Sequence, residues 1–508
     1  MSVSVALLLA LVTVAVALIW RTSTRDLHLP PGPKGWPIIG NALQLPKTQG
    51  WVTYAQLAKK YGDIMHLSAL GSPMIILTSG QAISDLLEKR GHLYSDRPTT
   101  PMASDLIGYA RMTVLCPYGT LLKESRKLIT GTINARNAPQ LQRIMESKIH
   151  QLLPRLLTSP KDFQSHLRWF VASIVLQITH GHEIRDSNDP LVQMAELVNT
   201  QFSETATPGK FLVDIFPFLR YVPDWVPGAG FKRIAQEARH SLDRMLDEPY
   251  QQVKEQVMRG TASPSFTSEL IESDPHPSPE QLFTNKMASS QFYLAGADTT
   301  VSALEIMFVI LALYPEVQRK AQAEIDTVVG TAQLAKGSDR DSLPYVNGLV
   351  KEIHRWNPVV PLALPHMAVQ DDTYKGYHIP KGAVIIANSW AMLHDPSIYP
   401  DPFEVKPERY LNRTNGGINP DPENWSFGYG RRVCPGQIMA DDTIFLLTAA
   451  VLATFNVTSA RTLDGKELGK DVKNIGGIIC HPPPFTCEIT PRSPATKEFI
   501  ASLGAHGH

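Results

Sequence analysis

The longest block of apolar positions in the chain runs from residue 281 to residue 313. These 33 residues contain no proline, and Lys286, Asp298 and Glu305 are their only charged side chains. At about 1.5 Å per residue the block predicts a continuous helix of about 50 Å, which Pro315 ends. A helix this long with so few charges has no polar face for water, so we expect it to cross the middle of the fold.

A second uncharged block, residues 3–20, lies at the N-terminus. Its 18 residues give about 27 Å of helix, close to the ~30 Å hydrocarbon core of a bilayer. A cleavable signal peptide is the alternative, but no charged side chain precedes the block. We predict one transmembrane anchor over residues 1–20, and Arg21 and Arg25 after it predict that the rest of the chain is cytosolic.

The region after the anchor is rich in proline and predicts a stiff hinge over residues 21–45, followed by one large folded domain over 46–508. The apolar stretch 211–231 contains charges and three prolines, so it is either a buried loop or a surface that dips into a membrane. The Ser, Thr and Pro content of 260–279 predicts an exposed connection.

Short β-branched runs at 74–78 and 384–387 predict a minor sheet in a chain that is otherwise mainly helical. Composition agrees with a large folded protein. Hydrophobic residues make up 43%, which excludes a disordered chain, and 48 basic residues balance 48 acidic ones, which gives no electrostatic case for nucleic-acid binding. Four cysteines are too few for a disulfide scaffold.

One of these cysteines, Cys434, lies in a glycine-rich segment that precedes an apolar helical stretch, 438–455. Glycines allow backbone amides to approach a sulfur closely, and the positive end of a following helix stabilises a thiolate. Such a thiolate is suited to ligate iron. A structural cysteine in a tight turn is the alternative for an isolated pattern of this kind.

The full spacing goes beyond an isolated pattern. Phe427, Gly430, Arg432, Cys434 and Gly436 stand at the positions of Phe-x-x-Gly-x-Arg-x-Cys-x-Gly, which resembles the haem-binding signature of the cytochrome P450 family. The resemblance implies the triangular fold of this family with a long central helix. It also implies that Cys434 is the axial ligand of haem b and that Arg432 pairs with a haem propionate.

The long apolar helix carries the hexapeptide 295–300, Ala-Gly-Ala-Asp-Thr-Thr. Thr299 can bond back to the carbonyl of Ala295 and open the helix locally. The hexapeptide resembles the oxygen-binding groove of the family. The resemblance implies that Thr299 and Asp298 are catalytic proton carriers there.

Glu352 and Arg355 lie at i and i+3 of a predicted helix with apolar neighbours, which favours burial of the pair. They resemble the Glu-x-x-Arg pair of the family, and Arg409, within Pro-Glu-Arg, resembles the arginine that completes this structural network. The sequence around 315–326 and 343–347 looks like fungal membrane-bound members, which include tailoring enzymes of secondary metabolism.

One position departs from the pattern. Many members have Trp-x-x-x-Arg in an early helix, and here Leu122 occupies the tryptophan position while Arg126 remains. A lost hydrogen bond to a charged propionate is worth ~1.5–3 kcal/mol. We consider Lys123 as a compensating donor.

By position in the family pattern, the cofactor-binding residues include His366 as well as Arg126 and the cysteine loop. The substrate pocket is expected to contain apolar, mid-sized residues: Phe292, Ala295, Val360, Leu362, Leu364 and Ile478. Segments 102–115 and 211–231 are expected to cap it. Such residues suit a hydrophobic substrate, such as a terpenoid or polyketide.

The implied function is a haem-dependent monooxygenase of the endoplasmic reticulum membrane. No nucleotide-binding fingerprint is present, so NADPH is expected to act only through a separate reductase, with cytochrome b5 as a further possible partner. Lys123, Arg126, Lys127 and Arg431 form a candidate docking face. A haem-thiolate isomerase or dehydratase that needs no reductase, and a non-catalytic haem-binding membrane protein, remain as alternatives.

Overall fold

The computed structural model describes residues 28–184, 189–206, 210–331, 333–411 and 418–505. The predicted anchor and the start of the predicted hinge lie outside these residues. Two compact units are present, and each is described by itself. The first contains residues up to 98 together with 365–388, and the second contains 99–364 and 389 onwards.

The first unit is built on a four-stranded sheet in the order β1-β2-β6-β3. Strands β1 (Ile64–Ala69) and β2 (Ser72–Leu77) pair as an antiparallel hairpin, and β6 (Val384–Ala387) adds in parallel to β2, with Met74 opposite Val384. Strand β3 (His366–Met367) forms the other edge. The minor sheet predicted at 74–78 and 384–387 is thereby confirmed, with the two runs as direct neighbours.

The remaining elements of the first unit are short. They are η1 (Ala42–Gln44), α2 (Gly50–Tyr61), α3 (Gly80–Ile83), η2 (Ser84–Lys89), α4 (Gly91–Tyr94) and a hairpin of β4 (Asp372–Tyr374) with β5 (Tyr377–Ile379). The Asn388 side chain ties the end of β6 to the Trp51 carbonyl of α2 at 2.8 Å.

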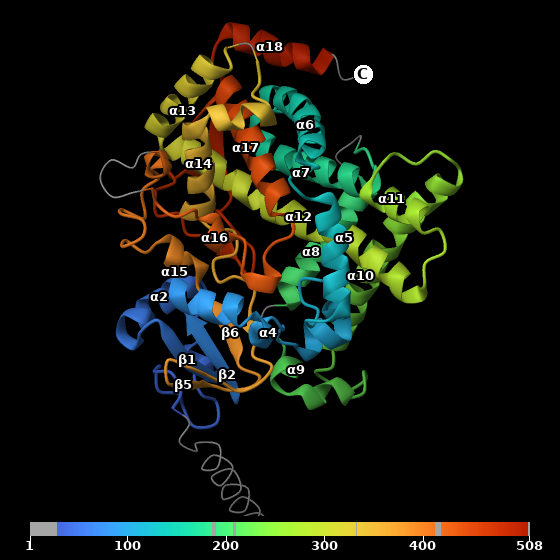
Figure 1. Cartoon of the computed structure of the whole chain (residues 1–508), viewed down its shortest axis with the longest axis vertical. Coiled ribbons are helices and arrows are strands. Elements are labelled where there is room, and N and C mark those ends of the chain that lie inside the picture. Colours follow the sequence, from blue (N-terminus) through green and yellow to red (C-terminus); the bar gives the residue numbers. More distant parts are fainter. Residues whose placement is uncertain (1–27, 185–188, 207–209, 332, 412–417, 506–508) are drawn as a thin grey trace, which may run out of the picture. The chain divides into compact units, whose positions relative to one another are not determined.

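The second unit is mainly helical and is organised around α12 (Pro279–Leu313). Helix α12 packs against α5 (Thr120–Thr132), α7 (Phe163–His180), α10 (Phe231–Met258) and α17 (Gln437–Thr454), as Figure 1 shows. Ser278 caps its start by accepting from the Gln281 amide, and Pro279 stands at its first turn, where no amide is needed. The predicted central helix is therefore confirmed, with a start two residues earlier.

Other helices complete this unit. They are η3 (Pro101–Ile107), η4 (Tyr109–Arg111), α6 (Ala138–Thr158), η5 (Pro160–Asp162), α8 (Pro190–Thr205), α9 (Leu212–Ile215), η6 (Pro217–Tyr221), α11 (Phe266–Ser273), α13 (Pro315–Val328), η7 (Gly337–Ser342), α14 (Pro344–Trp356), α15 (Ser389–Leu393), η8 (Pro407–Tyr410), α16 (Glu423–Ser426), η9 (Gly430–Arg432) and α18 (Pro494–Ala505). Two small sheets, β7 (Phe455–Thr462) with β10 (Phe485–Pro491) and β8 (Ile475–Gly476) with β9 (Cys480–His481), lie beside them.

Two described helices, α12 and α17, are long and apolar enough to cross a membrane. Their most apolar windows are 72% and 78% buried, so they are helices of the protein core. A mainly helical chain with small sheets agrees with the predicted fold class.

The predicted exposed connection at 260–279 was partly wrong. It contains α11, in which Phe266 and Ile271 are buried. A capping box, in which Ser265 and Ser268 bond each other's amides, starts this helix.

Candidate active site

The cysteine loop joins α16 to α17. Gly428 and Gly430 adopt φ angles of 79° and 54°, which side chains with a Cβ rarely tolerate. The Cys434 amide donates to the Phe427 carbonyl at 2.8 Å, which closes the loop, and a Cβ on Gly436 would lie 3.8 Å from the Cys434 sulfur. The sulfur is thus held by backbone at the start of α17, and Cys434 is half-buried.

Burial, a backbone amide and a nearby arginine together set the pKa of the Cys434 thiol. Burial raises the pKa of the Cys434 thiol, while the Gly436 amide and the charge of Arg126 oppose the increase without cancelling it. The amide that the sequence analysis expected is present, but the polypeptide alone leaves the thiol protonated. A metal cation at the sulfur would supply the missing stabilisation.

Two arginines lie near the cysteine. Arg432 is buried, and its guanidinium donates to the carbonyls of Cys116 at 2.6 Å and Thr113 at 3.2 Å. Arg126, on α5, is half-buried, and no carboxylate among the described residues forms an ion pair with it. Burial accordingly lowers the pKa of Arg126. A half-buried arginine of this kind is suited to an anionic ligand group.

Lys123, which the sequence hypothesis considers as a compensating donor, lies on α5. It is exposed, and its ammonium lies over the Tyr118 ring, 5.1 Å from the centroid. Arg431 also lies 5.1 Å from that centroid and donates to the Tyr118 hydroxyl at 2.9 Å. Both cations therefore contact Tyr118, while Leu122 is buried at the usual tryptophan position.

The middle of α12 is accessible although its flanks are buried. Residues 284–294 and 300–311 are almost entirely buried, whereas Ala295 is exposed and the four residues after it are half-buried. The Thr299 hydroxyl donates to the Ala295 carbonyl at 2.7 Å, the bond expected from the sequence. A Cβ on Gly296 would contact only Val175, at 3.7 Å. We call residues 295–299 the α12 window.

Asp298, in the α12 window, has an ion-pair partner. Its carboxylate forms an ion pair with His481 at 3.3 Å, and the other ring nitrogen of His481 lies 2.9 Å from Glu305. Sequence reasoning missed this pairing, because His481 is 176 residues from Glu305 and has no local motif.

The predicted pocket residues lie in three parts of the second unit: helix α12, the segment after α14, and the turn between β8 and β9. Phe292 is buried and packs against Phe266 in a tilted ring contact with centroids 4.9 Å apart. The other five are accessible to different degrees: Ala295 is exposed, and Val360, Leu362, Leu364 and Ile478 are half-buried. The remaining predicted cofactor residue, His366, belongs to the first unit, where it is buried and its Nδ1 lies 2.6 Å from the Tyr94 carbonyl.

Glu352 and Arg355 form a fully buried, two-pronged ion pair at 2.6 and 2.8 Å. Arg409 approaches the same carboxylate at 3.6 Å, and the Tyr410 hydroxyl and the Lys406 amide donate to it at 3.0 and 2.8 Å. The structure therefore brings the three predicted network residues together, with every oxygen of Glu352 bonded.

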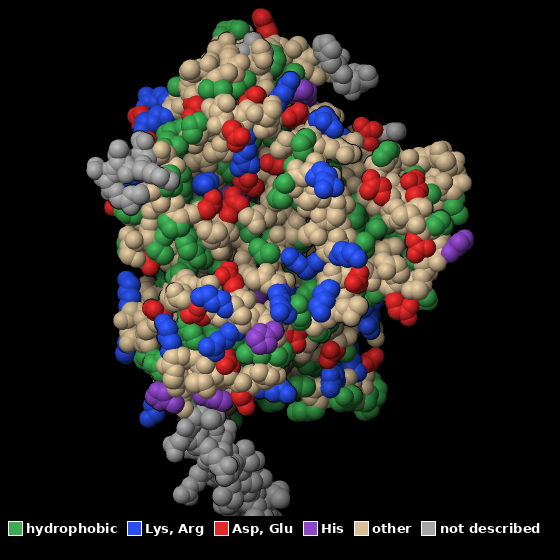
Figure 2. Space-filling view, in the orientation of Figure 1, with side chains coloured by type: hydrophobic (Ala, Val, Ile, Leu, Met, Phe, Trp, Pro, Cys, Tyr) green, Lys and Arg blue, Asp and Glu red, His purple; other side chains and the backbone are tan. Residues whose placement is uncertain are grey.

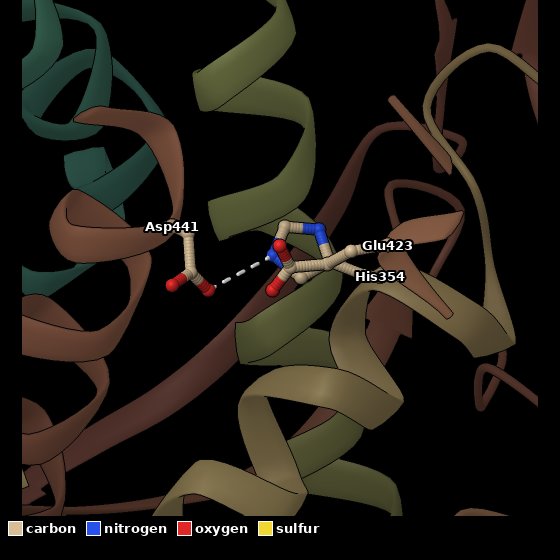
Figure 3. Close-up of side chains that lie close together, drawn as sticks. All are labelled: His354, Glu423 and Asp441. Carbon is tan, nitrogen blue, oxygen red and sulfur yellow. Dashed lines mark ion pairs between the residues drawn. The ribbon is translucent and has the colours of Figure 1, made fainter. Parts of the chain in front are cut away.

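Next to this network lies a cluster of His354, Glu423 and Asp441, whose ligand-type atoms are within 4.8 Å of one another. They come from α14, α16 and α17, and the dashed line in Figure 3 marks the ion pair between His354 and Asp441. The two paired atoms are 3.5 Å apart. Arg340 pairs with Asp441 at 2.6 Å, and Gln437 donates to Glu423 at 2.6 Å.

Burial and the charge of Asp441 raise the pKa of Glu423. Burial opposes ionisation of Asp441 as well, but the bond from His354 and the charge of Arg340 lower its pKa. Because the carboxylates already have these partners, we interpret the cluster as a clamp. It joins the helices before and after the cysteine loop, and the His354 ring packs edge-on against Phe427 at 5.0 Å.

Basic side chains gather near α5 in Figure 2. Lys123, Lys127 and Arg431, three of the four predicted docking residues, are exposed, and Arg126 is half-buried.

The segment 211–231 is a surface and not a buried loop. Leu212, Phe218, Tyr221 and Trp225 are 66–83% exposed, and hydrophobic side chains gather over α9 in Figure 2. Asp214 accepts from the Met102 amide at 2.8 Å, so the two segments expected to cap the pocket lie against each other.

Comparison with known proteins identifies the class. The cytochrome P450 family model matches residues 30–488. Cytochrome P450 monooxygenase 208 of Postia placenta is 42% identical over 95% of this chain and 94% of its own length. Cytochrome P450 monooxygenase COX2 of Coprinopsis cinerea is 42% identical over 96% and 94%, and claR of Ampulloclitocybe clavipes is 38% identical over 97% and 92%.

The chain therefore belongs to the cytochrome P450 family, whose members are haem-thiolate enzymes. Its relatives are fungal monooxygenases, so it is an oxidoreductase that incorporates oxygen and uses haem. The isomerase and carrier alternatives are not favoured.

Proposed function

We propose that this protein is a membrane-anchored monooxygenase that inserts one atom of dioxygen into a hydrophobic small molecule, such as a terpenoid or polyketide of fungal secondary metabolism. The observation that carries the proposal is the cysteine loop, in which the Gly436 amide and Arg126 oppose the effect of burial on the Cys434 thiol. A sulfur held in this way lacks only a cation to become a thiolate.

The residues present fit a haem group. Cys434 would ligate the haem iron, and Phe427, Gly430 and Gly436 would shape the loop that carries this cysteine. Arg126, which has no carboxylate partner in the described chain, and the buried Arg432 would hold the propionates. When bound, haem supplies a thiolate-ligated iron that activates dioxygen for insertion into the substrate.

The chain's own residues would then orient the substrate and move protons. Phe292, Ala295, Val360, Leu362, Leu364 and Ile478 would form an apolar wall that excludes water. Thr299, with its hydroxyl proton directed at the Ala295 carbonyl, offers its oxygen as an acceptor in the α12 window. Asp298, one residue before it, would hold and release a proton at its carboxylate.

The membrane part of the proposal rests on two segments. Residues 1–20 would anchor the chain in the endoplasmic reticulum membrane, residues 21–45 would act as a hinge, and 46–508 would be the catalytic domain in the cytosol. The exposed aromatic side chains of segment 211–231 suit contact with lipid at the interface.

Electrons would come from NADPH through a separate reductase, with cytochrome b5 as a second donor. The exposed Lys123, Lys127 and Arg431 near α5 suit an acidic partner surface.

The first test is the carbon monoxide difference spectrum of the reduced full chain. The wild type is expected to give the red-shifted Soret band of a thiolate-ligated haem, and Cys434→Ala is expected to lose it. Cys487→Ala, which removes another half-buried cysteine, is the matched control and should keep the band. An imidazole-like band in all three proteins would contradict the assignment of Cys434.

A further inference from the structure

One face of α12 contacts strand β9. Asp298, Ser302 and Glu305 follow each other at spacings of four and three residues, so they lie on the same side of the helix. The Ser302 hydroxyl donates to the Cys480 carbonyl at 2.6 Å. The two acids pair with the two ring nitrogens of His481: Nε2 lies 3.3 Å from Asp298 and Nδ1 lies 2.9 Å from Glu305.

Burial differs along this face. Glu305 and Ser302 are buried, whereas the side chains of His481 and Asp298 are 23% and 33% exposed. A buried carboxylate is costly unless it is paired. Within the described residues, His481 is the cation that pairs with Glu305. The ring is therefore fixed at its buried end and offers its other nitrogen to the accessible acid in the α12 window.

The charge state of His481 follows from its neighbours. An imidazole can donate to two carboxylates only when both nitrogens carry protons. Burial lowers the pKa of His481, but the hydrogen bonds and charges of Asp298 and Glu305 outweigh burial and raise the pKa to about 9. The neighbouring Cys480 thiol stays neutral, because burial raises its pKa to about 12.

We propose that His481 is a positioning residue for Asp298: anchored by Glu305, it orients the Asp298 carboxylate beside Thr299 for proton transfer. The proposal rests on the monooxygenase function proposed above. It resembles the logic of a catalytic triad, in which a buried acid orients a histidine that in turn serves the reacting group. Here the histidine serves a second acid, which carries the proton.

The arrangement predicts how proton supply depends on pH. Below pH 9 the imidazolium holds Asp298 in place. Above pH 9 His481 loses a proton to solvent, the ion pair is lost, and Asp298 is no longer held. Reductase-supported NADPH oxidation should therefore fall as pH rises through about 9.

The test compares the wild type with His481→Gln and Glu305→Gln as full-length, haem-loaded proteins. His276→Gln, which changes an exposed loop histidine, is the matched control and also corrects for the reductase's own pH dependence. NADPH oxidation is measured from pH 6 to 10 in H2O and D2O, per unit of protein that gives the thiolate carbonyl band.

In the wild type and His276→Gln we expect activity to fall near pH 9. In His481→Gln we expect no such fall, a rate about tenfold lower at pH 7 and a larger solvent isotope effect. Glu305→Gln should move the fall to lower pH. If His481 had only a structural role, His481→Gln would lose folded protein or haem. The enzyme that remained would then keep the pH dependence of the wild type.

A second readout does not use turnover. NMR of 15N-histidine-labelled protein in the diamagnetic ferrous carbonyl state, with His481 assigned from its absence in His481→Gln, gives the imidazole pKa directly. We expect about 9 in the wild type and a lower value in Glu305→Gln. An ordinary histidine pKa near 6.5 would overturn the proposal, as would an unchanged pH profile in His481→Gln. A wild type without a thiolate band would instead refute the proposed function itself.

Discussion

The buried Glu-x-x-Arg pair allows the sharpest stability prediction. In Arg355→Ala, the Glu352 carboxylate would lose its two-pronged partner at a site with no exposed side-chain surface, and its nearest remaining cation, Arg409, is 3.6 Å away. Removing one partner of a buried pair costs ~3–5 kcal/mol. The carbonyls of Leu393 and Pro402 would also lose their donor, and the Glu404 carbonyl would keep only the bond from Arg409. We therefore expect the free energy of unfolding to fall by at least ~3–5 kcal/mol.

The assay is urea unfolding of the full chain in detergent micelles, followed by far-UV circular dichroism. The chain offers a matched control in Arg244, which pairs with Glu248 at 2.6 and 3.2 Å through the same two-pronged geometry. Both of these side chains are about half exposed, at 49% and 48%, so Arg244→Ala should cost less than ~0.5 kcal/mol. Equal losses in the two variants would refute the argument from burial.

Four further variants test other features of the structure. Gly348→Ala should destabilise the protein by ~1–3 kcal/mol, because the added Cβ would lie 2.6 Å from the Pro407 carbonyl oxygen. Gly131→Ala, in an open stretch of α5, should instead stabilise it by ~0.5–1 kcal/mol. Urea unfolding measures both changes. Asp441→Asn should lower the temperature at which the carbonyl band is lost by weakening the clamp around the cysteine loop, and an unchanged temperature would contradict that role. Trp225→Phe should reduce quenching of tryptophan fluorescence by brominated lipids in full-length protein in bilayers; undiminished quenching would place segment 211–231 away from lipid.

The parts of the fold that could be predicted from the sequence have strong local signals. Helix α12 was predictable because its apolar run is long and proline-bounded, and only its start moved, to Pro279. Helix α11 was missed because its eight residues include three serines and threonines, so its composition resembles a loop. Its buried face, with Phe266 and Ile271, becomes visible only when the neighbouring helices are in place.

The same distinction applies to the site. The sequence alone could identify Cys434, Glu352 and Arg355, because each belongs to a short motif of residues that are close together in the chain. His481 could not be found in this way, because it acts across 176 residues of sequence from a two-residue strand. The sequence also could not predict the net effect on the Cys434 thiol, since the balance between amide, arginine and burial depends on packing.

The hairpin of β8 and β9 has a consequence for changing what this enzyme accepts. Ile478, a candidate substrate contact, lies in the turn between the two strands, only three residues before His481. A library of larger or smaller residues at position 478 would move the turn that carries the histidine, so altered selectivity would come with altered efficiency of electron use. Directed evolution at this turn should therefore recover efficiency through second changes near Ser302, whose hydroxyl ties Cys480 to α12.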